Sequence, residues 1–190
     1  MIKTFGCKVN TYDSGRLRDK MGELPSDVHI VNTCAVTKEA SLEAVRHIKK
    51  FKLAFPDKKI VVTGCSAQVD TEMFSELPEV DLIIANSHKS EIRDIIFSNF
   101  KEQKNHFFEQ QHNSKVYKSN IFKKEDLDEG GGIEPGHTRS FLKIQDGCNS
   151  FCTFCVIPFA RGKSSSIPIE QLVERVNELH SQGIKEVVLT

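Results

Sequence analysis

Six cysteines are the residues of this sequence best suited to chemistry, and their spacing divides them into two sets of three. The compact set is Cys148, Cys152 and Cys155, and the wide set is Cys7, Cys34 and Cys65. A secreted disulfide framework is usually short and rich in loops, whereas these cysteines interrupt an alternating pattern of strand-like and helix-like segments. The pattern therefore favours metal or redox chemistry over structural disulfides.

The compact set gathers three thiols in one loop, which begins just after a strand-like segment. A structural zinc site prefers four closed ligands, and the nearest histidine downstream is His180, far outside finger spacing. A 4Fe-4S cluster held by three thiolates leaves one iron open for a substrate or a cofactor, so we favour an open iron-sulfur site. Two alternatives stay open: a zinc site, and a redox pair of Cys152 and Cys155, which the additional Cys148 makes less typical.

The cysteines of the wide set are related by their positions in the predicted fold, because each follows a predicted parallel strand. The carboxyl ends of such strands are neighbours, and ligand sites form in the crevice beside them. The three thiols can therefore meet at one site, although they are distant in sequence. The alternative is that they are buried and pack as small hydrophobic side chains. Beside the first two cysteines, Asn10 and Asn32 are expected to act as caps, with hydrogen bonds to a cluster or to loop backbone as the second option.

The composition is that of a soluble protein that forms a core. Hydrophobic residues make up 38% of the 190 residues and charged residues 27%, which excludes disorder as the main state. The 26 basic residues balance the 26 acidic ones, so net charge gives no sign of nucleic-acid binding. No apolar run approaches the roughly 20 residues that span a bilayer, and the first residues lack an apolar signal core, so a cytoplasmic location is expected.

The first hundred residues predict an α/β fold. Strands are predicted at 2–5, 28–31, 60–63 and 82–84, and helices at 12–24, 38–55, 71–77 and 90–100. Short β-branched runs that alternate with helices of this length are typical of βαβ units in a parallel sheet. We therefore predict a small doubly wound domain over residues 1–100.

A linker and the start of a second domain are predicted after it. Residues 101–136 are polar and contain three consecutive glycines, with one short strand expected at 115–117. Residues 137–190 predict a strand at 140–145, a helix at 168–180 and a strand at 186–190. A single βαβ unit leaves an open sheet edge, so we expect the chain to be a fragment of a longer protein.

Longer motifs around the cysteines carry a family resemblance. The string KIQDGCNSFCTFCVIPFARG resembles the cluster motif of the radical S-adenosylmethionine superfamily and, within it, that of the radical methylthiotransferases. The strings TFGCKVNTYDS, VNTCAVTKEAS and VVTGCSAQ are similar to the amino-terminal domain of the same family. The resemblance covers nearly the whole chain apart from about 97–136.

The resemblance implies a complete chemistry. The compact set would hold a 4Fe-4S cluster that binds S-adenosylmethionine at its open iron and reduces it to a 5'-deoxyadenosyl radical, inside a partial (β/α) barrel. Phe154 would lie beside the adenine, and Arg161 would contact the cofactor or the active site. The wide set would hold a second 4Fe-4S cluster that serves sulfur transfer. The implied partners are a tRNA substrate and an electron donor such as flavodoxin or ferredoxin, with no membrane.

Small motifs favour one branch of the family. GCKVN, NTCAVT and KIQDGC are most similar to the branch that modifies threonylcarbamoyladenosine in tRNA, whereas the isopentenyladenosine branch usually has Gln-Met in place of Lys8-Val9. The alternatives are that isopentenyladenosine branch, a zinc-stabilised RNA-binding module, and a remnant that binds clusters without turnover. Because most of the barrel wall is missing, we expect the chain to be catalytically incompetent on its own. No individual catalytic side chain is predicted.

Overall fold

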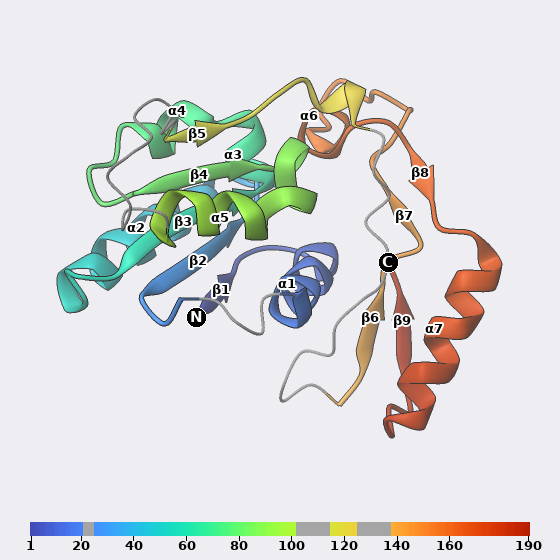
Figure 1. Ribbon diagram of the computed structural model, residues 1–190. Helices are drawn as coiled ribbons and strands as arrows, with labels where there is room; N and C mark the ends of the chain where they lie inside the picture. The colour runs from blue at the N-terminus through green and yellow to red at the C-terminus, as the bar shows by residue number, and fades with distance from the viewer. Residues whose placement is uncertain (21–24, 102–114, 125–137) are drawn as a thin grey trace.

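The computed structural model describes residues 1–20, 25–101, 115–124 and 138–190 (Figure 1). The strands are β1 (Ile2–Thr4), β2 (Val28–Thr33), β3 (Lys59–Gly64), β4 (Leu82–Ala85), β5 (Val116–Tyr117), β6 (Ser140–Leu142), β7 (Gln145–Asp146), β8 (Ser165–Ser166) and β9 (Val187–Leu189). The helices are α1 (Lys8–Lys20), α2 (Lys38–Ala54), α3 (Cys65–Val69), α4 (Thr71–Ser75), η1 (Asn86–Glu91), α5 (Ile92–Lys101), η2 (Ile121–Lys123), α6 (Ile157–Arg161) and α7 (Ile169–Ser181).

Strands β1 to β5 form one parallel sheet whose order follows the chain. Helices cover both of its faces (Figure 1). On one face, Leu17 of α1 and Ile96 of α5 pack against the strands; on the other, Ile48 of α2 and Phe74 of α4 do so. Strand β2 is buried along its whole length, as is usual for a parallel strand covered on both sides.

The carboxy-terminal part contains one βαβ unit and a short antiparallel pair. Strands β6 and β9 are parallel neighbours joined through α7, and β7 pairs with β8. Helix α1 contacts β6, and α3 contacts α6, so this part packs directly on the amino-terminal sheet domain. No helix in the described residues is both long enough and apolar enough to cross a membrane.

The predicted α/β class, with helices on both sheet faces, is confirmed. The strand expected at 115–117 is β5, which joins the first sheet. The strand expected at 140–145 is two strands, because the backbone changes partner from β9 to β8. Helix α1 begins earlier than predicted, and the end of that prediction at 21–24 lies outside the described residues, as do the glycines of the proposed linker. The domain boundaries at residues 100 and 137 stay a prediction.

Candidate functional site

The wide set lies along one edge of the amino-terminal sheet. Cys34 directly follows β2, Cys65 directly follows β3, and Cys7 comes three residues after the end of β1. These three strands are parallel neighbours, with Thr4 opposite Asn32 and Thr33 opposite Gly64. The strand order thus brings three distant cysteines to the same end of the sheet, as the sequence predicted for parallel topology.

Two glycines allow the loops of this edge to approach closely. Gly6 and Gly64 both have a φ of +100°, a backbone conformation that other residues rarely adopt. A Cβ atom on Gly6 would lie only 2.5 Å from Sγ of Cys34. A Cβ atom on Gly64 would lie 2.6 Å from the backbone nitrogen of Thr33. Each glycine therefore creates the space that the cysteine loops occupy.

The thiols of the wide set influence one another. Cys34 and Cys65 are buried, whereas Cys7 is exposed. Burial raises the pKa of the Cys34 thiol, and the neighbouring Cys65 and Cys7 act in the same direction. A thiol in such a place resists ionisation until a cation or a metal centre compensates the charge.

Two asparagines, Asn10 and Asn86, contact Cys65, and a third, Asn32, hydrogen-bonds the backbone of Asn10. Asn10 Oδ1 lies 3.8 Å from Sγ of Cys65, and its Nδ2 donates to the carbonyls of Phe5 and Thr33. Asn32 Nδ2 donates to the carbonyl of Asn10. The prediction that Asn10 and Asn32 act as helix caps was wrong. Both side chains are buried, and they hydrogen-bond loop or helix backbone instead.

Asn86 is a residue that the sequence did not single out. It directly follows β4, the next strand along the same sheet edge, and its Nδ2 lies 3.7 Å from Sγ of Cys65. The same nitrogen donates to the carbonyl of Ala160 in α6 at 2.9 Å. Its Oδ1 atom is buried without a hydrogen-bond partner in the described part of the chain. A buried orphan acceptor beside a thiol leaves capacity for a further polar group at this place.

The compact set lies in a loop that follows β7. The backbone N–H of Cys148 donates to the carbonyl of Gly162 at 3.1 Å, which closes the loop at its base. The backbone N–H of Ser150 donates to Sγ of Cys148 at 3.5 Å and lowers the pKa of that thiol. Cys152 is exposed, and Cys155 donates its backbone N–H to the carbonyl of Cys152 at 2.9 Å. Within this loop Cys152 is therefore open to solvent, while Cys148 and Cys155 are half-buried.

Phe154, the predicted adenine neighbour, projects from this loop with 91% of its surface exposed. Phe151 has a φ of +46°, which is unusual for a residue with a side chain. Its ring lies 5.9 Å from that of Phe122 and 6.2 Å from that of Phe159. Packing of Phe151 against these rings holds the loop, while Phe154 makes no such ring contact among the described residues and is free to meet a ligand.

Arg161 lies at the contact between the two parts of the protein. Its Nη1 donates to Asp146 Oδ1 at 2.8 Å, and its Nη2 donates to Asn10 Oδ1 at 2.7 Å and Asp13 Oδ2 at 2.9 Å. Lys89 and Lys143 donate to the two oxygens of the same Asp13, each at 3.0 Å. Burial alone would raise the pKa of Asp13, but the three cations hold it well below its ordinary value. The predicted cofactor contact of Arg161 stays a prediction.

Sequence reasoning missed four members of this cluster, Asp13, Lys89, Lys143 and Asp146. Asp13 is separated from Lys89 by 76 positions and from Lys143 by 130. Local patterns cannot connect residues so far apart. The available signal was their place in the motifs: Asp13 lies in TFGCKVNTYDS, and Lys143 and Asp146 lie in KIQDGC just before the compact set.

The donor chemistry of both sets fits iron-sulfur clusters. Thiolates are the usual ligands of such clusters, and three thiols with one open position suit a cluster that also binds a ligand. Among the described residues, no group of three or more His, Cys, Asp or Glu side chains is gathered as a site for a metal ion. The role of all six cysteines as metal ligands therefore stays a prediction from chemistry and position.

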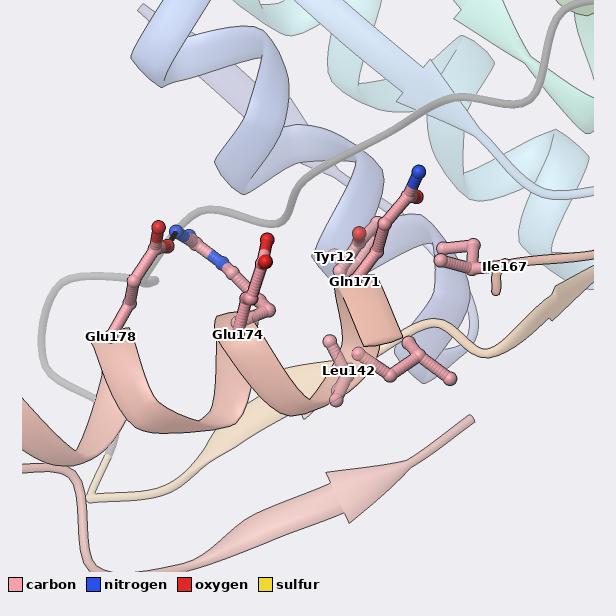
Figure 2. Close-up of a pocket in the computed structure, with 8 residues that line it drawn as sticks. Tyr12, Leu142, Ile167, Gln171, Glu174 and Glu178 are labelled. Atoms are coloured by element: carbon pink, nitrogen blue, oxygen red, sulfur yellow. Dashed lines mark hydrogen bonds and ion pairs between the residues drawn. The ribbon is translucent and has the colours of Figure 1, made fainter. Parts of the chain in front are cut away.

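A separate pocket lies between α7, β6 and α1 (Figure 2). It has a volume of about 410 Å³ and contains no cysteine. Figure 2 shows Tyr12 of α1, Leu142 of β6, and Gln171 and Glu174 of α7 among the residues that line it. None of the site residues predicted from the sequence lines it, so the pocket does not identify the cysteine chemistry.

Comparison with known families gives two matches along the chain. Residues 1–85 match the family model described as uncharacterized protein family UPF0004, and residues 142–190 match the Radical SAM superfamily. The first match contains the wide set and the second contains the compact set. The boundary between the matches falls within 86–141, which includes the proposed linker.

Several relatives align over nearly the whole chain. The chain is 36% identical to the threonylcarbamoyladenosine tRNA methylthiotransferase MtaB of Aquifex aeolicus and 41% identical to that of Rickettsia prowazekii. It is 34% identical to the tRNA-2-methylthio-N(6)-dimethylallyladenosine synthase of Thermodesulfovibrio yellowstonii. The alignments cover 100%, 100% and 99% of this chain but 46%, 42% and 44% of the relatives. The chain thus spans less than half the length of these relatives.

Proposed function

We propose that this chain serves to add a methylthio group to a nucleoside of tRNA. The proposal starts from its family: over the part of its relatives that it spans, the chain belongs to the radical S-adenosylmethionine methylthiotransferases. The observation that carries the proposal is the pairing of two three-cysteine sets in one chain, each at the end of a strand and with a packed interface between them. One set suits a radical-generating cofactor and the other suits a sulfur donor.

The compact set would hold one 4Fe-4S cluster, and the wide set would hold the second. When bound, the clusters and S-adenosylmethionine would supply a 5'-deoxyadenosyl radical that takes the hydrogen of an unactivated C–H bond and sulfur that replaces it, and a further S-adenosylmethionine would supply the methyl group. The contribution of the chain is to position these groups. Cys148, Cys152 and Cys155 leave a fourth position open for S-adenosylmethionine, beside which the exposed ring of Phe154 can stack on the adenine.

The environment of the wide set suits a protected sulfur site. Cys34 and Cys65 are buried, which keeps bulk water away from two of the three thiols. Asn10 and Asn86 direct amide groups at Cys65, and Gly6 leaves room for Cys34. Outer contacts of this kind tune the potential and orientation of a metal centre. The remaining partners that we propose are a flavodoxin- or ferredoxin-like electron donor and a cytoplasmic tRNA.

Threonylcarbamoyladenosine is the substrate that we propose. The motifs around Cys7, Cys34 and Cys148 support this branch, and Lys8-Val9 stands where the isopentenyladenosine branch usually has Gln-Met. Relatives named for threonylcarbamoyladenosine have 34% to 41% identity, and relatives named for dimethylallyladenosine have 32% to 34%. This difference is small, so the motifs carry most of the weight.

Nucleoside mass spectrometry of tRNA tests the substrate directly. Cells in which the gene for this chain is disrupted should accumulate unthiolated threonylcarbamoyladenosine and lose its 2-methylthio form. Isopentenyladenosine and its methylthio form should keep their ratio and serve as the internal control. A loss of methylthio groups from isopentenyladenosine alone would assign the protein to the neighbouring branch. Zinc in place of iron and acid-labile sulfide in the purified chain would contradict the radical chemistry itself.

A further inference from the structure

A buried ion network joins the two parts of the protein, and the proposed chemistry makes no direct use of it. Its members are Asp13, Lys89, Lys143, Asp146 and Arg161. The side chains of Asp13 and Lys143 are each only 2% exposed. Asp13 and Lys89 belong to the amino-terminal sheet domain, whereas the other three members belong to the part that contains the compact set.

Asp13 is the centre of the network. Its Oδ2 accepts from Nζ of Lys89 at 3.0 Å and from Nη2 of Arg161 at 2.9 Å, while its Oδ1 accepts from Nζ of Lys143 at 3.0 Å. Lys143 also donates to Asp146 at 3.1 Å. One carboxylate therefore organises three cations, two of which come from the other part of the chain.

The network leads by direct contacts to both cysteine sets. Nη2 of Arg161 donates to Asn10 Oδ1, the same atom that lies next to Sγ of Cys65. In the other direction, Nη1 of Arg161 donates to Asp146 Oδ1, which also accepts from the backbone N–H of Gly147 at 3.1 Å. Gly147 immediately precedes Cys148. A continuous series of polar contacts thus runs from Cys65 to the start of the cysteine loop.

Stability alone does not explain a network of this kind. Removing several ions from water is costly, and apolar side chains of similar volume would often give an equally stable interface. Apolar surfaces can slide, however, whereas a guanidinium bonded to two carboxylates accepts only a narrow range of positions. Buried charges of this sort select one geometry.

We propose that Asp13 and Arg161 are positioning residues that hold the wide set and the compact set at one fixed separation. This inference rests on the proposed function, in which sulfur must reach a radical formed at the other site. The rate of a reaction between two groups falls steeply when they are displaced even slightly from their reactive positions. The network lies at the interface between the two sites, where it can fix the distance between them.

The test uses the chain with both clusters reconstituted and reduced. Each reduced cluster is paramagnetic, so electron paramagnetic resonance measures the dipolar coupling between them, which falls with the cube of their distance. The unaltered chain should give one defined coupling. Asp13→Asn and Arg161→Lys should each give a weaker coupling spread over a range, with iron and sulfide per chain unchanged. Arg139→Lys, at the exposed pair of Arg139 with Glu186, is the matched control and should leave the coupling unaltered.

The possible outcomes separate the two proposals. Iron for only one cluster in the unaltered chain would overturn the proposed function and the positioning role with it. Two clusters with the same coupling in the unaltered chain and in Arg161→Lys would overturn the positioning role alone. Should Asp13→Asn not fold, Arg161→Lys decides the matter, because lysine keeps the charge and loses only the second arm of the fork.

Discussion

The Nε2 atoms of His29 and His47 lie 2.9 Å apart, so one imidazole donates a hydrogen bond to the other. His29 is buried in β2, its ring is stacked on Phe51 with 3.8 Å between the centroids, and its Nδ1 is buried without a partner in the described residues. Burial lowers the pKa of His29 from 6.5 to about 4, and His47 and the amino terminus act in the same direction. The pair is therefore built around a neutral His29.

This pair predicts loss of stability in acid. Because the pKa of His29 is lower in the folded chain than in the unfolded chain, the unfolded state binds the proton first as pH falls. His29 should not affect the free energy of unfolding above pH 6.5. As the pH falls from 6.5 to about 4, this free energy should decrease by at most roughly 3 kcal/mol. Urea unfolding across this range measures the effect.

In His29→Gln the free energy of unfolding should fall less steeply as the pH is lowered, because glutamine does not titrate. His180→Gln, the same substitution at an exposed position on α7, is the control. Identical pH profiles for His29→Gln and the unaltered chain would show that the acid sensitivity has another origin.

Gly64→Ala should destabilise the chain strongly. The residue combines a φ of +100° with a Cβ position that overlaps the β2 backbone, so alanine adds both backbone strain and a clash. The free energy of unfolding should fall by roughly 3 kcal/mol. Gly183→Ala is the control, since Gly183 has a φ of +85° with open space around it and should lose only about 1 kcal/mol. Equal losses at the two sites would argue that Gly64 matters only through its φ.

Phe154→Ala should weaken S-adenosylmethionine binding without affecting the fold. With 91% of its surface exposed, the ring contributes little to packing, whereas loss of stacking on an adenine should raise Kd by about tenfold. Calorimetric titration of the reconstituted chain measures the change, and thermal unfolding monitors the fold. Leu53→Ala, at an 84% exposed position on α2, should change neither quantity. An unaltered Kd in Phe154→Ala would remove Phe154 from the cofactor site.

Serine variants of the cysteines should show that each cysteine set binds its own share of the iron. Replacing either the whole wide set or the whole compact set should leave about half of the iron and acid-labile sulfide per chain after reconstitution. The two triple variants serve as controls for each other. The variant that retains the compact set should still bind S-adenosylmethionine, and the other should not. Full iron in either variant would mean that its altered cysteines bind no cluster.

Much of the fold and part of the site could be predicted from local patterns. Strands such as β2 and β3 are short, β-branched and buried, and the amphipathic helix α2 lies between them in the sequence, so the parallel sheet follows from nearest-neighbour rules. The meeting of Cys34 and Cys65 at one sheet edge follows from that topology. The helix that starts at Cys65 was not foreseen, because its five residues are too short to show periodicity.

The candidates for the chemistry could be identified from the amino-acid sequence alone: six thiols, their spacing, and the glycines that precede three of them. How the two sets are joined could be seen only in the folded protein. Asp13 and Arg161 are 148 positions apart, and nothing near either residue distinguishes a buried ion from a solvated one. A buried charge is tolerated only where its partners converge, and that convergence arises when the two parts of the chain pack together.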